Sequence, residues 1–293
     1  MGALIWLASY PKSGNTWLRT FLHNLLRDAQ EPVPLEKLTD FCLGESWLSW
    51  IEPHAKKPLA TLTEPEIARL RPLGQADMTK AFHDSVFVKT HNHLGQWHGV
   101  PLHNMDVTAG GIYVVRNPLD VAISAHHHFN ATLDKMISIM ARPMASSPLT
   151  DKLMPEVYSS WSAHVKSWTE RPAPQLLVLR YEDLLADPAK HFGVVAGFLG
   201  LQPSPERLHR AVRNSSFEVL KAQEQREGFR ERPEHADSFF REGRAEQWRE
   251  VLTPEQVRRI IADHHVQMAR FGYIPDDYKD AVPYGTGVTA TTS

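Results

Sequence analysis

The sequence has a single cysteine, no long apolar run and no excess of positive charge. Cys42 alone can form no internal disulfide, which suits a reducing compartment, so we expect a cytoplasmic protein. No apolar run approaches the ~20 residues of a membrane span, and the N-terminal stretch lacks the basic region of a signal peptide. The net charge of −2 argues against a nucleic-acid partner, because no global basic field is present.

Length and composition are those of an ordinary globular protein. The 293 residues are 42% hydrophobic and 23% charged, which allows a large core and gives no disorder signature. No internal repeat and no second domain are visible. We therefore predict a single domain over residues 1–293, with a flexible Gly- and Thr-rich tail at about 279–293.

Four short apolar runs, at 5–8, 85–88, 111–115 and 176–179, each end in a polar cluster. Short apolar runs without alternation are typical of strands buried on both faces. Helical patterns lie at 16–26, 119–129, 156–170 and 187–199, and a shorter one at 64–70 follows a Thr63 cap. Strands that alternate with helices predict an α/β fold, with a central mostly parallel sheet flanked by helices. We expect residues 136–155 to be an irregular insertion that forms a pocket wall.

The four polar clusters begin at Lys12, Lys89, Arg116 and Arg180. Ligands of such sheets bind outside the carboxyl ends of the strands, where all four clusters lie. Each cluster taken alone is as readily a solvated loop, but four together predict one shared site.

The loop Tyr10-Pro11-Lys12-Ser13-Gly14-Asn15-Thr16 resembles a phosphate cradle. The backbone N–H groups of Ser13 to Thr16 open a helix, whose positive dipole end attracts anions. Lys12 adds a full charge, and Gly14 permits a tight turn and close approach of an anion. The lysine precedes the glycine, so the loop departs from the order of the common P-loop. Trp17 either offers a flat face to a base or lies in the core.

A second anion site is predicted after the third strand. Arg116 leaves that strand and Ser124 lies on the following helix, so both side chains can reach one anion. The alternative is that Arg116 only pairs with the nearby Asp120. A nucleotide with phosphates at two positions would fill both predicted sites.

The motifs together resemble the sulfotransferases that use 3′-phosphoadenosine 5′-phosphosulfate. The loop from Tyr10 to Trp17 is similar to their 5′-phosphosulfate loop, the stretch from Arg116 to Ser124 to their 3′-phosphate motif, and Lys89-Thr90-His91 to the segment with their catalytic histidine. Tyr181-Glu182-Asp183-Leu184, Asn214-Ser215-Ser216-Phe217 and Phe240-Arg241-Glu242-Gly243 with Trp248 are similar to later nucleotide-binding segments. The likeness runs in order from about Ile5 to Tyr273.

This resemblance implies transfer of a sulfuryl group from that donor to a hydroxyl or amine of a small-molecule acceptor, with adenosine 3′,5′-bisphosphate as the product and no metal. It implies that His91 is the general base and that Lys12 and Lys89 stabilise charge on the transferring group. The implied nucleotide contacts are Ser13, Gly14, Asn15 and Thr16 at the 5′-phosphate, Arg116, Ser124, Arg241 and Gly243 at the 3′-phosphate, Trp17, Ser215 and Phe217 at adenine, and Tyr181.

The sequence departs from the family pattern at several positions. Glu242 stands where the family usually has lysine, and Glu246 where it has glycine. The dimerisation segment of animal members is not matched after Arg249, so the oligomeric state stays open. The first loop looks more like that of bacterial members than of animal ones.

Three alternatives remain from the sequence alone. A nucleotide kinase or NTPase could use a similar sheet, although the loop order opposes this. A protein could bind the nucleotide without catalysis, although Lys12 with His91 argues for chemistry. The acceptor could be a glycan or a lipid rather than a small molecule. His126, His127 and His128 invite a metal site, but successive helical residues point in different directions, and His164 is expected to be packed.

Overall fold

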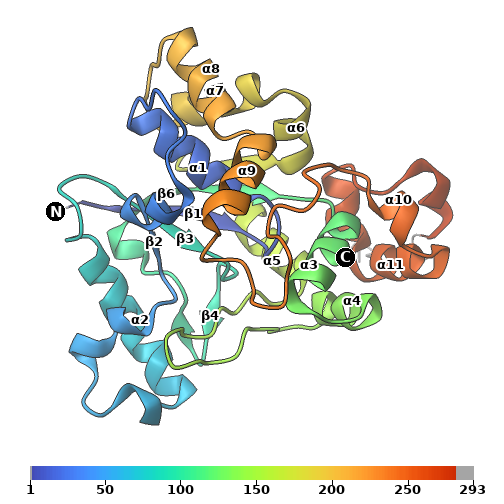
Figure 1. The fold of residues 1–293 in the computed structure, drawn as a ribbon. Helices are drawn as coiled ribbons and strands as arrows, with labels where there is room; N and C mark the ends of the chain where they lie inside the picture. Colours follow the sequence, from blue (N-terminus) through green and yellow to red (C-terminus); the bar gives the residue numbers. More distant parts are fainter. Residues whose placement is uncertain (1, 282–293) are drawn as a thin grey trace, which may run out of the picture.

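The computed structural model describes residues 2–281 and is built on a five-stranded sheet in which every pairing is parallel (Figure 1). The strand order is β2-β3-β1-β6-β7. The strands are β1 (Leu4–Ser9), β2 (Cys42–Gly44), β3 (Val86–Thr90), β6 (Thr108–Val115) and β7 (Leu176–Arg180), and a separate hairpin pairs β4 (Gln96–Trp97) with β5 (Val100–Pro101).

Helices connect the strands and cover both faces of the sheet. They are α1 (Asn15–Leu26), α2 (Glu64–Met78), α3 (Pro118–Phe129), α4 (Leu133–Ala141), α5 (Trp161–Thr169), α6 (Tyr181–Ala186), α7 (Pro188–Phe198), α8 (Pro205–Asn214), α9 (Phe217–Glu227), α10 (Trp248–Val251) and α11 (Pro254–Arg270). Within residues 2–281, none of these helices has the length and apolarity to cross a membrane.

Two apolar cores lie on opposite faces of the sheet because successive strand side chains point in opposite directions. On β1, Trp6 and Ala8 belong to the core shared with α3, α5 and α11, whereas Leu7 belongs to the core shared with α1, α7 and α8. In Figure 1, α1, α7 and α8 lie together, apart from the group formed by α3, α4 and α11. Because both faces of the sheet are buried, the strand sequences are apolar throughout and do not alternate between apolar and polar residues.

The sheet has a topological switch point between β1 and β6. The connection after β1 leads through α1 to β2 on one side, whereas the connection after β6 leads through helices to β7 on the other. A crevice opens where neighbouring connections diverge, and ligands of open α/β sheets bind there. The loop after β1 carries Lys12, and Arg116 follows β6 directly.

The predicted parallel α/β fold is confirmed, and each of the four expected strands is present. Sequence reasoning missed β2, a strand of three residues at the sheet edge. It is too short for a periodic pattern, and its Cys42 is buried by pairing with β3. The helices after residue 204 were also not anticipated.

Three predicted segments need correction. The helix expected at 156–170 begins only at Trp161, because Ser159 has a positive φ of 59° and Ser160 caps the helix. The helix expected at 64–70 continues to Met78, since its buried face keeps packing past Pro72. The expected irregular insertion at 136–155 contains the end of α4. The flexible tail was predicted for about 279–293. Residues 279–281 form the end of a short 3₁₀ helix, and residues 282–293 lie outside the described residues.

Candidate active site

A cavity of about 470 Å³ lies at the carboxyl ends of the strands. It gathers side chains from segments that are far apart in the sequence, as the four strand-end clusters predicted. Its lining includes the following predicted residues: Lys12, Gly14, Asn15, Thr16, Trp17, Lys89, His91, Arg116, Ser124, Tyr181, Phe217, Arg241 and Gly243. Two predicted residues, Ser13 and Ser215, are not part of this lining.

The first loop opens α1 through a glycine in the left-handed region. Gly14 is the N-cap residue, with a φ of 100°, and a Cβ at this position would lie 2.7 Å from the ring of Tyr181. No other residue fits both constraints without strain. The first N–H groups of α1 have no intrahelical acceptors, so this end of the helix offers donors to an anion.

The polar side chains of the loop have different tasks. The Asn15 amide donates to the carbonyl of Leu7 at 2.8 Å and thereby ties the loop to β1. Thr16 accepts from Arg19 at 3.1 Å. Ser13 is fully buried, and its hydroxyl has no hydrogen-bond partner among residues 2–281. An unpartnered buried hydroxyl is costly unless a ligand satisfies it.

Lys12 has an unusual backbone and a perturbed ammonium group. Its φ of 66° is uncommon for a side chain with a Cβ, and such conformations gather at functional sites. The Lys12 Nζ atom lies 3.2 Å from Nδ1 of His128 and 3.9 Å from the ring centroid of Phe239. Burial and the nearby charge of Arg116 lower the pKa of Lys12 to about 7. A bound anion would reverse this effect.

His91 presents one defined nitrogen to the cavity. Its Nδ1 lies 2.8 Å from the carbonyl oxygen of Ser9, and a carbonyl only accepts, so Nδ1 carries the hydrogen. Nε2 is then the unprotonated nitrogen. Burial, with the charge of Lys89, lowers the pKa of His91 to about 4. The imidazole is therefore neutral near pH 7 and can accept a proton at Nε2.

The backbone of His91 is also fixed. His164 donates from Nε2 to the carbonyl oxygen of His91 at 3.1 Å, and its Nδ1 lies 2.9 Å from the hydroxyl of Tyr113. His164 is fully buried, as expected from the sequence. It positions the strand end rather than facing the cavity.

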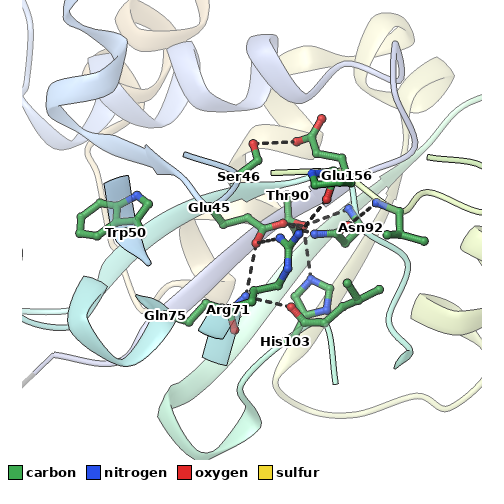
Figure 2. Close-up of polar contacts among 12 residues, drawn as sticks. Glu45, Ser46, Trp50, Arg71, Gln75, Thr90, Asn92, His103 and Glu156 are labelled. Carbon is green, nitrogen blue, oxygen red and sulfur yellow. Dashed lines mark hydrogen bonds and ion pairs between the residues drawn. The ribbon is translucent and has the colours of Figure 1, made fainter. Parts of the chain in front are cut away.

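A buried polar network holds the two neighbours of His91 (Figure 2). Glu45 receives a hydrogen bond from Thr90 at 3.2 Å and another from the amide of Asn92. Arg71 pairs with Glu45 at 2.8 Å and donates to the carbonyl of Pro155 at 2.7 Å. Glu45 and Arg71 are 0% and 1% exposed in their side chains, so this ion pair lies in the interior.

Arg116 lines the same cavity and contacts the first loop. Its guanidinium donates to the carbonyl of Lys12 at 3.0 Å and lies 4.4 Å from the ring centroid of Tyr181. The alternative partner, Asp120, instead accepts from the backbone N–H groups of Glu246 at 2.7 Å and Trp248 at 3.1 Å. Arg116 thus retains donors for a ligand.

The segment after α9 completes this side of the cavity. Gly243 has a φ of 65°, and a Cβ there would lie 2.3 Å from the ring of Phe217. Glu242 lies within 3.6 Å of Arg241 and 3.5 Å of Arg244, so its charge is shared between two guanidinium groups. Glu246 adopts a φ of 61°, which gives a conformational reason why glycine suits that position.

For Ser215 the adenine contact stays a prediction, and its side chain has another partner in the structure. It caps the end of α8, is fully buried, and donates its hydroxyl to the carbonyl of Ala211 at 2.9 Å. Its side chain therefore serves the helix end. Trp17 combines both interpretations from the sequence: it lines the cavity, and its ring packs edge-on against Tyr181 and Phe192.

The histidine triplet lies on α3. His126, His127 and His128 line a second cavity of about 460 Å³ beside Ser124 and Arg241, and His128 also lines the first. The part of the chain that the structure describes holds no group of three or more His, Cys, Asp or Glu side chains placed to share a metal ion. The expectation of a metal-free reaction stays a prediction.

Several cavity residues had no signal in the sequence. Glu231 accepts two hydrogen bonds from Arg19, both at 2.8 Å, across 212 residues of sequence. Burial raises the pKa of the Glu231 carboxyl, whereas the charge and hydrogen bonds of Arg19 lower it. The lowering prevails, and this pKa lies far below its usual range. Glu156 and Phe239 also line the cavity. No spacing rule connects such distant residues, so only the fold reveals them.

Comparison with known proteins gives a consistent result. The sulfotransferase domain family matches residues 4–272. Sulfotransferase 1B1 of Mus musculus is 28% identical over 272 residues, which are 90% of this chain and 82% of the relative. Sulfotransferase 1A1 of Canis lupus familiaris is 26% identical over 273 residues, 91% of this chain and 83% of the relative. These relatives are mammalian, so the expected likeness to bacterial members stays a prediction.

Solved structures share the fold. The mouse sulfotransferase SULT7A1 complexed with PAP superposes with a TM-score of 0.59 at 20% identity, covering 92% of this chain and 88% of that one. Retinol dehydratase in complex with androsterone and the inactive cofactor PAP gives a TM-score of 0.61 at 20% identity, covering 90% and 80%.

Proposed function

Because this chain belongs to the sulfotransferase domain family, we propose that it transfers the sulfuryl group of 3′-phosphoadenosine 5′-phosphosulfate to a hydroxyl or amine of a small-molecule acceptor. Adenosine 3′,5′-bisphosphate (PAP) is then the second product. Family membership opposes the kinase alternative, and it gives a reason for the lysine that precedes Gly14 in the first loop.

The residues present fit such a nucleotide at two points. At the 5′ end, the free N–H groups of α1, the unpartnered hydroxyl of Ser13 and the ammonium of Lys12 are suited to a phosphosulfate. At the 3′ end, Arg116, Ser124 and Arg241 line the same cavity and are suited to a phosphate. The rings of Trp17 and Phe217 lie on the lining for the base, and Tyr181 lies against Arg116.

The orientation of His91 is the observation that carries the proposal. Its Nδ1–H is committed to the carbonyl of Ser9 at 2.8 Å, which leaves Nε2 to take the acceptor's proton. The bond from sulfur to the acceptor oxygen forms as the bond from sulfur to the bridging oxygen breaks. Lys12 stabilises the negative charge that develops on the bridging oxygen, and Lys89 holds sulfuryl oxygens.

The small-molecule acceptor is supported by the shape and chemistry of the cavity. Its volume of about 470 Å³ must hold parts of both nucleotide and acceptor. The lining also includes the largely apolar side chains of Trp47, Leu153 and Tyr158, which suit a compact apolar body. Androsterone and retinol, which occur with PAP in the retinol dehydratase complexes, are small apolar molecules of this kind.

PAP is expected to raise the thermal unfolding midpoint, whereas ADP and ATP–Mg²⁺ are not. A ligand at 100 times its dissociation constant adds about 2.7 kcal/mol to the free energy of unfolding. At roughly 2–4 °C per kcal/mol, the midpoint should rise by about 5–10 °C. In Arg116→Ala the shift should shrink, since the 3′-phosphate loses its planar partner. Stabilisation by ATP–Mg²⁺ alone would refute the proposed donor.

PAP binding is expected to weaken as the pH rises above 7. Lys12 has a pKa of about 7 in the free protein, and an anion raises that pKa, so binding takes up a proton at alkaline pH. The dissociation constant should be roughly tenfold larger at pH 8.5 than at pH 7.0 by titration calorimetry. Lys12→Arg should flatten this dependence because a guanidinium stays charged. Equal affinities of the unmodified protein at both pH values would contradict the assignment.

A further inference from the structure

The cavity contains a carboxylate without a cation of its own. Glu156 lines the cavity together with Lys89 and His91. Within residues 2–281, its carboxylate takes part in one hydrogen bond, from the hydroxyl of Ser46 at 3.4 Å, and in no ion pair within 4 Å. Figure 2 shows this carboxylate turned away from the Glu45–Arg71 pair, toward Ser46. Its remaining lone pairs are free for a ligand.

The position of Glu156 is fixed by its backbone. Its N–H donates to the hydroxyl of Ser147 at 2.9 Å, and its carbonyl accepts from the N–H of Ser147 at 3.0 Å. The preceding carbonyl, of Pro155, accepts from Arg71 at 2.7 Å. The backbone that carries the carboxylate is therefore held in place before any ligand binds, which reduces the entropy cost of binding.

Glu156 is ionised at neutral pH. Burial alone would raise the pKa of this carboxyl, but the nearby positive charges of Lys89 and Arg71 outweigh burial and lower it. Lys89 and His91 lie on the lining of the same cavity as Glu156. A negative charge thus lies in the cavity that also holds the proposed base.

The other charges of the cavity already have partners in the proposed complex. Lys12, Lys89 and Arg116 face the anionic groups of the donor. Glu231 is neutralised by Arg19, and Glu36 is exposed. Glu242, also on the lining, lies within 3.6 Å of Arg241 and 3.5 Å of Arg244. Among the carboxylates of this lining within residues 2–281, Glu156 is therefore the one left for the acceptor. Arg230, exposed at 5.2 Å from the ring centroid of Trp47, is the competing cation at the rim.

We propose that the acceptor is an amine-bearing phenol or alcohol, whose ammonium group pairs with Glu156 while its hydroxyl faces Nε2 of His91. This inference rests on the proposed sulfotransferase function. The apolar body of such an acceptor packs against Trp47, Leu153 and Tyr158. A neutral acceptor would leave the carboxylate desolvated without a partner, which is the physical basis of discrimination.

The test measures the sulfation of matched acceptors by the protein of residues 1–293, with the phosphosulfate donor present in every assay. Tyramine is paired with neutral 4-ethylphenol and anionic 4-hydroxyphenylacetate, and 3-hydroxybenzylamine is paired with 3-methylphenol to vary the distance between the two groups. We expect kcat/KM to be about 10- to 100-fold higher for at least one amine than for its neutral partner. Glu156→Gln should reduce that ratio to near one, mainly by weakening the amine reaction.

Glu36→Gln is the matched control, since it removes a carboxylate from the exposed rim of the same cavity, and it should leave the ratio unchanged. Equal kcat/KM for amine and neutral partners, preference for the anionic phenol, or turnover of neither amine would overturn the inference. So would an equal loss for all acceptors in Glu156→Gln. Failure of the sulfotransferase proposal is distinguishable, because PAP would then give no thermal stabilisation and no acceptor would be sulfated.

Discussion

His91→Ala is expected to lower kcat by roughly two to four orders of magnitude while the affinity for PAP stays within about twofold. The variant removes the group that is oriented to take the acceptor's proton at Nε2, since Nδ1 is held by Ser9 at 2.8 Å. The donor contacts assigned to Lys12 and Arg116 do not involve the imidazole. Initial-rate kinetics and thermal shifts with PAP measure the two effects separately.

The pH profile adds an independent readout of His91. Its pKa of about 4 means that the neutral, proton-accepting form is present throughout the neutral range. The rate should fall as the pH drops toward that value, and the decline attributable to His91 should be absent in the variant. His83→Ala, at an exposed turn before β3, is the control and should behave like the unmodified protein. Near-normal turnover in His91→Ala would refute the general-base role.

Arg71→Met is expected to lower the free energy of unfolding by about 3–5 kcal/mol. The substitution keeps most of the length of the buried side chain but leaves Glu45 without its counter-charge, at 0% exposure. Burial already raises the pKa of Glu45, with Arg71 as the main opposing influence, so this pKa should rise further in the variant. Below that raised pKa the carboxyl is neutral, and the loss of stability should therefore be smaller at acid pH. Chemical denaturation at two pH values measures both effects.

The double variant Glu45→Gln/Arg71→Met should recover most of the lost stability, because neither charge of the pair remains. The amide oxygen of the introduced glutamine can still accept from Thr90 and Asn92, as the carboxylate of Glu45 does. A single Arg71→Met variant within about 1 kcal/mol of the unmodified protein would show that the pair is not a determinant of stability.

The network has a consequence for catalysis as well as for stability. Thr90 and Asn92 flank His91, and Arg71 reaches the carbonyl before Glu156. The same ion pair thus supports the two neighbours of the base and the residue before the proposed acceptor carboxylate (Figure 2). Sites supported in this way keep their geometry because the supporting groups are themselves packed.

The sequence by itself determined the parallel sheet and the place of the site. Apolar runs without alternation require burial on both faces, and parallel strands bring their carboxyl ends to one edge. Lys12, Lys89, His91 and Arg116 each lie at the end of such a run or shortly after it, so their meeting in one cavity follows from local pattern and topology. The family resemblance then gave each a role.

The sequence did not determine which polar groups face inward. Ser215 is in the expected segment, yet its hydroxyl is used by the end of α8. Its position in a motif could not show this, because a serine at a helix end has a backbone carbonyl within reach as well as a ligand. A short polar side chain turns toward whichever hydrogen-bond partner is nearer, which for Ser215 is the backbone carbonyl of Ala211.

Only the tertiary structure decided the long-range pairs. Arg19 meets Glu231 across 212 residues, Arg71 meets Glu45 from a helix with no catalytic motif, and Glu156 lines the same cavity as His91. Local periodicity reports which side of an element is buried, since that depends on the chain's own geometry. Which charge lies opposite is set by how distant elements pack, and no pattern within one element contains that information.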